Sequence, residues 1–474
     1  MALMGAVGAG LILPATFRRA QAGEPPAAAP GGAPGPAPTR SAPALLVADR
    51  TDSNRVIPAK IHPSGFKRAD SCWNSLSLAS DGRLYFTLSI HAIDGYARLF
   101  RYDPATDEVK QLCDFGELTG EAARKMIPQG KSHSPWHEYD GKVYTGSHYG
   151  YFRTVGNKEQ PAAPPDGYLP YPGGHIISCD LRTGACEDVA VTVPEDGLQT
   201  MTLDPARGRI YGLTWPHGYF LTYDLGRREL HNLGKVSRDG EAGEGDRYLC
   251  LCRALGVVPE TGDVYFTNAD GEILRYRLEK DAVESVPGVT MRRDAFGTWD
   301  PSRPGHQGYN WRDIFWHAGH RVFYGVHPRS AWLFRFDPAE PRLELIERIA
   351  AAEIRHSGAF EPFRYGYITL RLGADKETIC YLTDDRGLTT QEGRRVRETV
   401  HLITYNLRTG QYADHGRLRL TDGRYPTMSQ TLALHPNGRL YACPWIENPR
   451  SSEARARGEY GGATCDLISF EMPA

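Results

Sequence analysis

Strand-like segments, in which apolar positions alternate with polar ones, follow one another along most of the chain and are joined by turns centred on glycine. In the typical unit two such segments flank a glycine turn, and a third ends in Tyr-Asp or Phe-Asp, as at Tyr102-Asp103, Tyr223-Asp224 and Phe336-Asp337. This pattern predicts short strands joined as hairpins. The units begin at Asp81, Tyr139, Arg207, Thr261, Gly319 and His401, with a partial copy at Asn437.

Repeated units of roughly forty to sixty residues, each with about four short strands, are typical of a β-propeller. Each unit of a repeat fold buries its apolar face only against its neighbours, so one domain can account for residues 44–474 of the 474-residue chain. We therefore predict an all-β, seven-bladed β-propeller, although six or eight blades also fit the pattern. The inner strands are expected to begin near Asn74, Trp136, Gln199, Arg253, Trp311, Tyr367 and Gln430.

The last unit runs out near residues 467–470, one strand short of a full blade. A strand-like segment without a unit of its own, residues 44–47, lies near the other end of the chain. We predict that this N-terminal strand pairs with the last blade. Such pairing would close the ring and remove an exposed sheet edge.

The first 43 residues differ in composition from the rest. Residues 1–17 are apolar and are followed by an arginine pair and by Ala20-Gln21-Ala22, which has the form of a signal-peptidase site. Residues 1–22 are therefore predicted to be a signal peptide, and the Ala/Pro/Gly-rich residues 23–43 a disordered tether. The expected location is secreted or periplasmic, with no stable membrane insertion after processing.

Charge and cysteine content narrow the range of partners and sites. The 55 basic and 57 acidic residues nearly cancel, so no overall field attracts nucleic acid, and an anionic ligand needs a local basic cluster. Nine cysteines occur without a Cys-x-x-Cys pair, which does not support a zinc ribbon. Cys179 and Cys186 flank a turn and can face each other across a hairpin. A closed ring without a free edge makes a monomer the simplest assembly.

The propeller topology predicts where unusual residues meet. Segments before the inner strands and turns between the second and third strands emerge on the same face of the ring. Most of the histidines and many arginines and aromatics lie in such segments. They are Trp73, Asn74, His91, Lys131, His133, His137, His148, His175, His217, Tyr219, Arg253, Tyr309, Trp311, Arg312, His327, Arg364, Gln430 and Trp445.

This face is poor in carboxylates, which disfavours glycoside hydrolysis by a carboxylate pair. Acyl transfer is not supported either, because no Gly-x-Ser-x-Gly motif is present. β-Elimination from a uronic acid fits better, since it requires a base, an acid and a clamp on the sugar carboxylate. Arginine suits the clamp because its planar fork matches a carboxylate.

Two segments carry a resemblance to a known group of enzymes. Residues 131–152, KSHSPWHEYDGKVYTGSHYGYF, and 208–225, GRIYGLTWPHGYFLTYDL, resemble the secreted β-propeller polysaccharide lyases, ulvan lyases above all and oligogalacturonate lyase more distantly. The resemblance implies that His133 or His148 forms a proton-transfer pair with Tyr219. It makes Arg253 the leading carboxylate clamp, with Arg312 or Arg364 as alternatives. Substrate contacts are predicted for His217, His175, Tyr309, Trp311, Arg312, Arg364, Trp73 and Asn74.

The sequence is compatible with a site that has no cofactor and with a site that holds a divalent metal ion. The leading interpretation requires none, but oligogalacturonate lyase holds a divalent ion through several histidines. A zinc, manganese or calcium ion could be held here by His133, His148, His175 and His217.

Two other classes of function also fit. A propeller without catalytic activity could use the same aromatic face to bind a glycan or a protein partner. A lactonase with a central calcium is disfavoured, because the carboxylates of such a site are scarce here. For the lyase, the expected ligand is an anionic polysaccharide or oligosaccharide.

Overall fold

The computed structural model describes residues 50–155, 158–300, 307–358, 369–384, 388–389, 395–396, 400–446 and 463–473. All of them belong to one compact unit, residues 42–474. The predicted signal peptide, tether and closing strand 44–47 lie outside the described residues, and so does Arg364. No helix among the described residues is long and apolar enough to cross a membrane.

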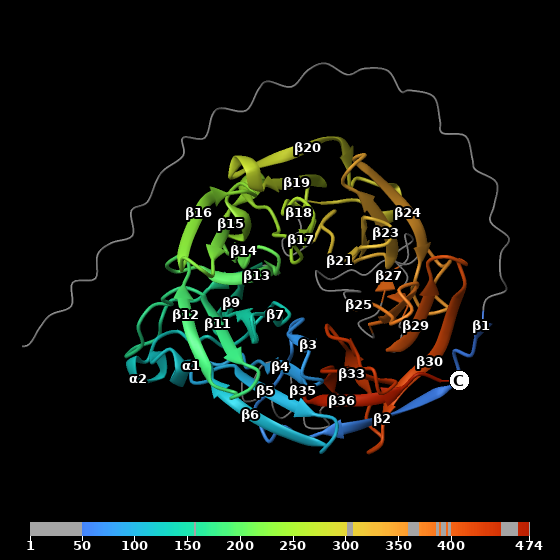
Figure 1. Ribbon diagram of the computed structural model, residues 1–474, viewed down its shortest axis with the longest axis horizontal. Helices are drawn as coiled ribbons and strands as arrows, with labels where there is room; N and C mark the ends of the chain where they lie inside the picture. Colours follow the sequence, from blue (N-terminus) through green and yellow to red (C-terminus); the bar gives the residue numbers. More distant parts are fainter. Residues whose placement is uncertain are drawn as a thin grey trace, which may run out of the picture. The chain divides into compact units, whose positions relative to one another are not determined.

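The sheets are arranged in a ring around a central channel, so the prediction of an all-β propeller is confirmed (Figure 1). Five separate sheets have four strands each. In order they are β3 (Leu76–Leu78), β4 (Leu84–Leu88), β5 (Arg98–Asp103) and β6 (Glu108–Asp114); β7 (His137–Tyr139), β8 (Lys142–Gly146), β11 (His175–Asp180) and β12 (Cys186–Val191); β13 (Gly197–Asp204), β14 (Arg209–Trp215), β15 (Tyr219–Asp224) and β16 (Glu229–Lys235); β17 (Gly256–Val257), β18 (Val264–Thr267), β19 (Glu272–Arg277) and β20 (Ala282–Thr290); and β21 (Asp313–His317), β22 (Val322–Val326), β23 (Trp332–Asp337) and β24 (Arg342–Arg348).

The ring continues as a nine-stranded sheet. Its members are β25 (Thr369–Leu372), β26 (Thr378–Leu382), β29 (His401–Asn406), β30 (Tyr412–Leu420), β2 (Val56–His62), β36 (Leu467–Glu471), β33 (Arg439–Ala442) and β32 (Ala433–Leu434), with β1 (Arg50–Thr51) also on β30. Strand β2 runs parallel to β30 over its first half and antiparallel to β36 over its second half. Divided between β30 and β2, this sheet contributes two more groups of four strands, which gives seven groups in all.

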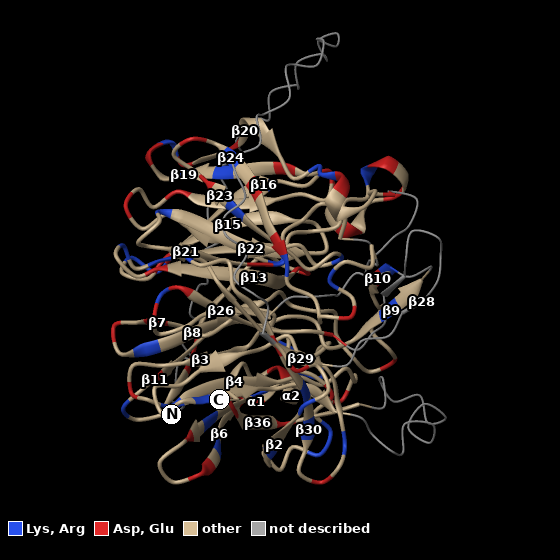
Figure 2. Cartoon of the chain, turned by 90° about the vertical axis from the view of Figure 1, so that its right-hand side faces the viewer, with Lys and Arg blue, Asp and Glu red and all other residues tan. Residues whose placement is uncertain are grey.

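Shorter elements lie between or beside the blades. They are the hairpins β9 (Phe152–Val155) with β10 (Lys158–Pro161) and β27 (Leu388–Thr389) with β28 (Arg395–Val396), the strands β31 (Pro426–Met428), β34 (Trp445–Ile446) and β35 (Thr464–Cys465), and the helices α1 (Phe115–Leu118), α2 (Glu121–Arg124), η1 (Gly240–Ala242), η2 (Gly245–Arg247), η3 (Leu278–Lys280) and η4 (Asp294–Phe296). Figure 2 shows the ring from the side, with β9, β10 and β28 projecting from one face.

The repeat is visible in the register of the strands. In six blades the pairing of the third strand with the fourth shifts near the start of the third strand. A bulge of this kind bends the strand and increases its twist. In these six blades the outer strand is therefore turned relative to the inner ones in the same way.

Aromatic side chains pack between neighbouring blades and form much of the core. Phe220 of β15 stacks on Phe266 of β18, with ring centroids 5.2 Å apart. Tyr265 and Phe336 pack across the next interface, at 5.4 Å. Each blade therefore buries its apolar faces against its neighbours, as expected for a repeat fold.

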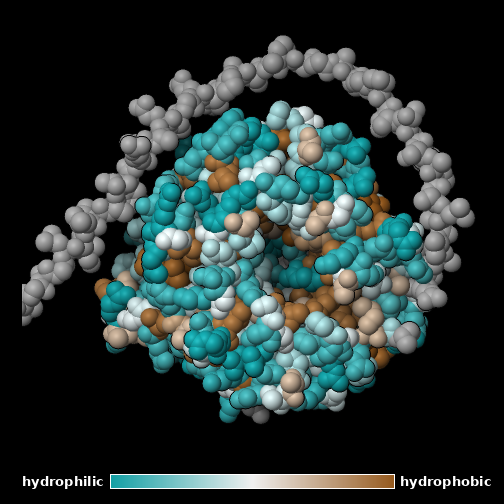
Figure 3. All heavy atoms as spheres, in the orientation of Figure 1, coloured by the Kyte–Doolittle hydropathy of each residue, from teal (hydrophilic) through white to brown (hydrophobic). Residues whose placement is uncertain are grey.

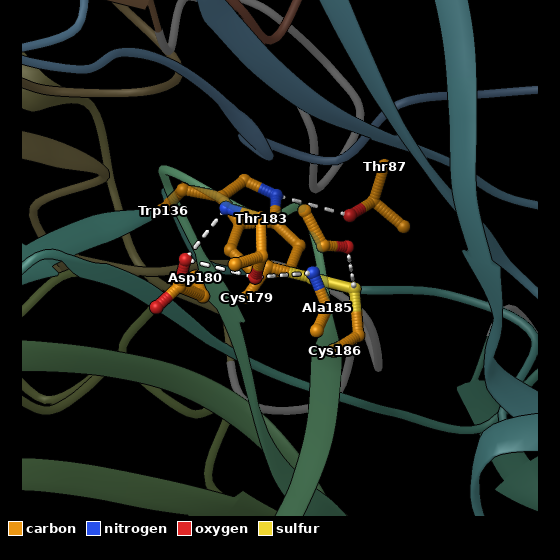
Figure 4. Close-up of a disulfide and its surroundings, with 8 residues drawn as sticks. Thr87, Trp136, Cys179, Asp180, Thr183, Ala185 and Cys186 are labelled. Carbon is orange, nitrogen blue, oxygen red and sulfur yellow. Dashed lines mark hydrogen bonds between the residues drawn. A yellow bond between two sulfur atoms is a disulfide. The ribbon is translucent and has the colours of Figure 1, made fainter.

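A disulfide joins Cys179 and Cys186, which lie opposite each other on β11 and β12 (Figure 4). The turn between them is held by Asp180, whose carboxylate accepts hydrogen bonds from the backbone and the hydroxyl of Thr183. The predicted pairing across this hairpin is confirmed. The other seven cysteines are free thiols.

We expect Ile57→Ala to lower the free energy of unfolding by about 2–5 kcal/mol. Ile57 is 2% exposed in β2 and packs in the cluster that contains Leu418 and Ile468, so its loss leaves a cavity between two blades. The neighbouring Val56, which is 40% exposed, provides the control: Val56→Ala should change stability by less than about 0.5 kcal/mol. Urea unfolding measures the stability of both variants. Equal effects would contradict the packing of Ile57 between the last two groups of strands.

Candidate functional site

The ring is hollowed at its centre, as the space-filling view shows (Figure 3). Two buried histidines meet in the second blade. His133 precedes β7, and His148 follows β8. A pair of backbone hydrogen bonds between Lys131 and His148, of 3.2 and 2.7 Å, holds the two segments side by side. As a result the imidazole centroids lie 5.4 Å apart, and both residues are 2% exposed.

Burial lowers the pKa of both His133 and His148 well below the usual value for histidine. The positive charges of Lys131 and Arg253 lower both values further, and Arg312 adds to the effect at His133. Both imidazoles are therefore neutral at neutral pH. A neutral imidazole can accept a proton, which is what a general base requires.

Aromatic rings enclose the histidine pair. Trp73 stacks on His133 with centroids 5.0 Å apart, and Trp215 meets His148 edge-on at 5.4 Å. The ammonium of Lys131 lies 5.4 Å from the ring of Trp73 and 4.7 Å from that of Phe152. Such cation–π contacts help to hold a buried charge in place.

Arg253 is held by a carboxylate from a neighbouring loop. Its guanidinium lies 2.6 Å from Glu241 and donates a hydrogen bond of 2.7 Å to the carbonyl of Leu251. Glu241 also accepts hydrogen bonds from the indole of Trp215 and from the amide of Leu251. A buried carboxylate therefore fixes both the proposed clamp and an aromatic neighbour of His148.

Arg312 and Asn74 belong to a chain of polar contacts across the ring. Arg312 is 4% exposed and precedes Asp313, which bonds Arg371 at 2.8 Å. Arg371 in turn donates a hydrogen bond of 3.2 Å to the side chain of Asn74, 297 residues away in the sequence. The first, fifth and sixth blades therefore meet at the channel.

Tyr219 and His217 form a separate group in the third blade. The two rings are 6.0 Å apart, and His217 bonds the buried carboxylate of Asp196 at 2.6 Å. The ammonium of Lys235 lies 5.9 Å from the Tyr219 ring. Within the described part of the chain, no ring contact or hydrogen bond joins Tyr219 to His133 or His148.

Two further candidates pack elsewhere. Trp311 is 0% exposed and donates its indole hydrogen bond of 3.0 Å to the carbonyl of Ala254, between the fourth and fifth blades. The hydroxyl of Tyr309 accepts a hydrogen bond from the backbone of Trp299. The structure therefore brings together His133, His148, Trp73, Arg253 and Arg312, but not Tyr219, His217, Trp311 or Tyr309.

His175 lies between two carboxylates. Its ring nitrogens bond Glu121 at 2.6 Å and Asp188 at 2.8 Å, and the side chain is 3% exposed. Burial acts to lower the pKa of His175, but the hydrogen bonds and charges of Asp188 and Glu121 outweigh it and raise the pKa to about 9. His175 is thus an imidazolium that ties α2 to the second blade.

The four histidines considered as metal ligands do not fit a shared divalent ion. Both nitrogens of His175 are bonded to carboxylates, and His217 is bonded to Asp196. Lys131, Arg253 and Arg312 place positive charge around the remaining pair, which opposes a cation. Among the described residues, the one group of three possible ligands within 4.8 Å is Cys113, Cys179 and Cys186, and two of these form the disulfide.

Sequence reasoning missed the importance of three neighbours of the pair. Lys131 and His91 stood among the residues of the predicted face but had no assigned role. Nothing in the sequence indicated Glu241, because along the chain it lies in neither a segment just before an inner strand nor a second-to-third turn. Only its contacts with Arg253 and Trp215 identify it.

Comparison with known proteins leaves the chain without an assigned family. No family model and no curated protein matches it. It is similar to the extracellular domain of a hybrid two-component system from B. thetaiotaomicron, at 12% identity and a TM-score of 0.49, over 88% of this chain and 40% of that one. It is also similar to a chain of the mitotic checkpoint complex, at 10% identity and a TM-score of 0.48, over 90% of this chain and 98% of that one. A protein described as a 6-phosphogluconolactonase from Bacteroides uniformis matches at 11% identity and a TM-score of 0.39, over 72% of this chain and 83% of that one.

The His175 cluster predicts a loss of stability at alkaline pH. A histidine whose pKa is raised to about 9 in the folded protein stabilises it fully below about pH 6.5 and loses that contribution as the pH rises through 9. The loss should be on the order of 3 kcal/mol in the free energy of unfolding. Urea unfolding at several pH values gives the free energy of unfolding as a function of pH. This free energy should fall less steeply with rising pH in His175→Gln than in the wild type. The exposed control His231→Gln should keep the pH dependence of the wild type. An unchanged pH dependence in His175→Gln would refute the raised pKa of His175.

Proposed function

We propose that this propeller is an exported polysaccharide lyase that cleaves a uronic-acid-containing glycan by β-elimination. One observation supports the proposal: two buried, neutral imidazoles lie side by side in the second blade, within the field of Lys131, Arg253 and Arg312. Elimination from a uronate needs a neutral base next to positive charge. The base removes the proton beside the carboxylate, and the positive charge stabilises the anion that forms.

His148 or His133 is proposed as the base. Both are buried, and burial keeps both neutral, so neither has to lose a proton before it can act. The cations around them favour a carboxylate ligand over a neutral sugar. This arrangement requires no cofactor.

Arg253 is proposed to bind the substrate carboxylate, with Arg312 as the second cation. Glu241 already bonds Arg253, but a guanidinium has five N–H donors and can serve two carboxylates at once. Glu241 would then orient the fork of Arg253 toward the channel. The half-buried Trp445, whose ring lies 5.5 Å from Trp73, offers an apolar surface for a neighbouring sugar ring.

The remaining parts of the proposal concern location and partners. Export to the periplasm or the exterior follows from the predicted signal peptide and agrees with a polymeric substrate outside the cell. The partner is an anionic polysaccharide or oligosaccharide, and the enzyme acts as a monomer. A non-catalytic propeller that binds the same glycan is the alternative, favoured by the near-complete burial of both histidines.

The test is incubation of the purified protein with ulvan, pectic, alginate and glycosaminoglycan polymers, followed in the near ultraviolet for unsaturated uronate. We expect His148→Ala to lower the rate by about 10²–10⁴-fold, because general base catalysis contributes that much. Binding of the polymer by this variant, measured by calorimetry, should persist. His231→Ala, on the exposed face of β16, is the control and should keep wild-type activity. Binding without product from the wild type would favour the non-catalytic alternative.

Burial is the main cause of the lowered pKa of His133 and His148, and the charge of Lys131 should lower it further. Lys131 is among the charges that lower the pKa of His148, so Lys131→Met should raise that pKa toward 6.5. Titration of the His148 ring by NMR measures the change, and the acid limb of kcat/KM should move to higher pH with it. Lys142→Met removes a charge that is paired with Glu187 on β12 and serves as the control. A pKa that stays at the wild-type value in Lys131→Met would exclude this electrostatic effect.

A further inference from the structure

A third histidine lies beside the pair and has a different environment. His91 follows β4 in the first blade, and its Nδ1 bonds Asp70 at 2.8 Å. Asp70 is 6% exposed and also accepts hydrogen bonds from the backbone of His91, at 2.8 Å, and from the hydroxyl of Ser71, at 2.6 Å. The carboxylate therefore fixes the orientation of the ring, with Nδ1 directed toward Asp70.

His91 belongs to the same cluster as the neutral pair. Its ring meets Trp73 edge-on at 5.9 Å and Phe152 at 5.4 Å. Trp73 also stacks on His133, and Lys131 lies over both aromatic rings. A positive charge on His91 lowers the pKa of His148, as expected for two nearby imidazoles.

The two kinds of histidine suit opposite tasks. His133 and His148 have Lys131, Arg253 and Arg312 around them, whereas His91 bonds the buried carboxylate of Asp70. Titratable groups in contrasting environments are how one site supplies both a base and an acid. Tyr219, the proton-transfer partner implied by the resemblance, contacts His217 and Lys235 instead of the pair.

We propose that His91, oriented by Asp70, is the general acid that protonates the departing oxygen when the glycan is cut. This assignment rests on the proposed lyase function and names a residue that the resemblance does not supply. Asp70 acts as a positioning residue, through His91.

The elimination step balances without a further reactant. The proton on C5 of the uronate passes to the neutral nitrogen of His148 or His133, and the electron pair of that bond forms the C4=C5 double bond. The C4–O bond breaks, and its oxygen takes the proton from Nε2 of the His91 imidazolium. His91 ends neutral and the base ends protonated, and exchange with water restores both.

The test compares two substrates in the full-length protein. One is an oligouronide, whose departing sugar oxygen needs a proton. The other is a synthetic uronide that carries 2,4-dinitrophenolate at C4, which departs without one. We expect His91→Gln to lower kcat on the oligouronide by about 10²–10⁴-fold and to lower it on the dinitrophenyl uronide by less than about tenfold. Asp70→Asn should show the same selective loss with little change in KM, and His231→Gln should show none.

Three results would overturn the assignment while the wild type remains active. The first is an equal loss of kcat on both substrates in folded His91→Gln and Asp70→Asn. The second is unchanged activity in both variants. The third is a loss confined to the oligouronide in Tyr219→Phe but not in His91→Gln or Asp70→Asn. Circular dichroism establishes whether the variants are folded. If His91→Gln does not fold, the selectivity of Asp70→Asn between the two substrates decides the assignment. A wild-type protein that forms no unsaturated uronate from either substrate overturns the proposed function together with this assignment.

Discussion

Closure of the ring is the constraint on which the site depends. Each inner strand borders the channel, so the residues that precede these strands are brought together from the whole length of the chain. The hydrogen bond from Arg371 to Asn74 joins the sixth blade to the first, and Trp73 meets Trp445 of the last unit. Strand β2 pairs with both β30 and β36 and so joins the last two groups of strands.

The second constraint is electrostatic. The buried cations Arg253 and Lys131 and the partly exposed Arg371 are each tied to a carboxylate or to aromatic rings: Arg253 to Glu241, Arg371 to Asp313, and Lys131 to Trp73 and Phe152. Burial of so much positive charge is costly unless it is paired in this way. The same charge, together with burial, keeps His133 and His148 neutral, so the arrangement that stabilises the cations also prepares the base.

Prediction from sequence succeeded where the relevant residues lie on one hairpin or in one blade. His133 and His148 were expected to meet because one precedes and the other follows a strand pair, and local pairing at Lys131 brings them to 5.4 Å. Cys179 and Cys186 were expected to pair across a single turn, and they do. Tyr219 and His217 were predicted to lie on the same face of the ring, and in the structure they contact each other, Asp196 and Lys235, all in the third blade.

The repeat pattern by itself determined the all-β propeller, the approximate number of its blades and the segments that border the channel, because strand periodicity and glycine turns are local properties of the chain. The tertiary structure alone decided which polar groups become partners. His175 between Glu121 and Asp188, Arg253 with Glu241, and His91 with Asp70 are all pairings made by side chains from separate segments. Protonation depends on burial and on charges a few ångströms away, and neither quantity exists until the ring has closed.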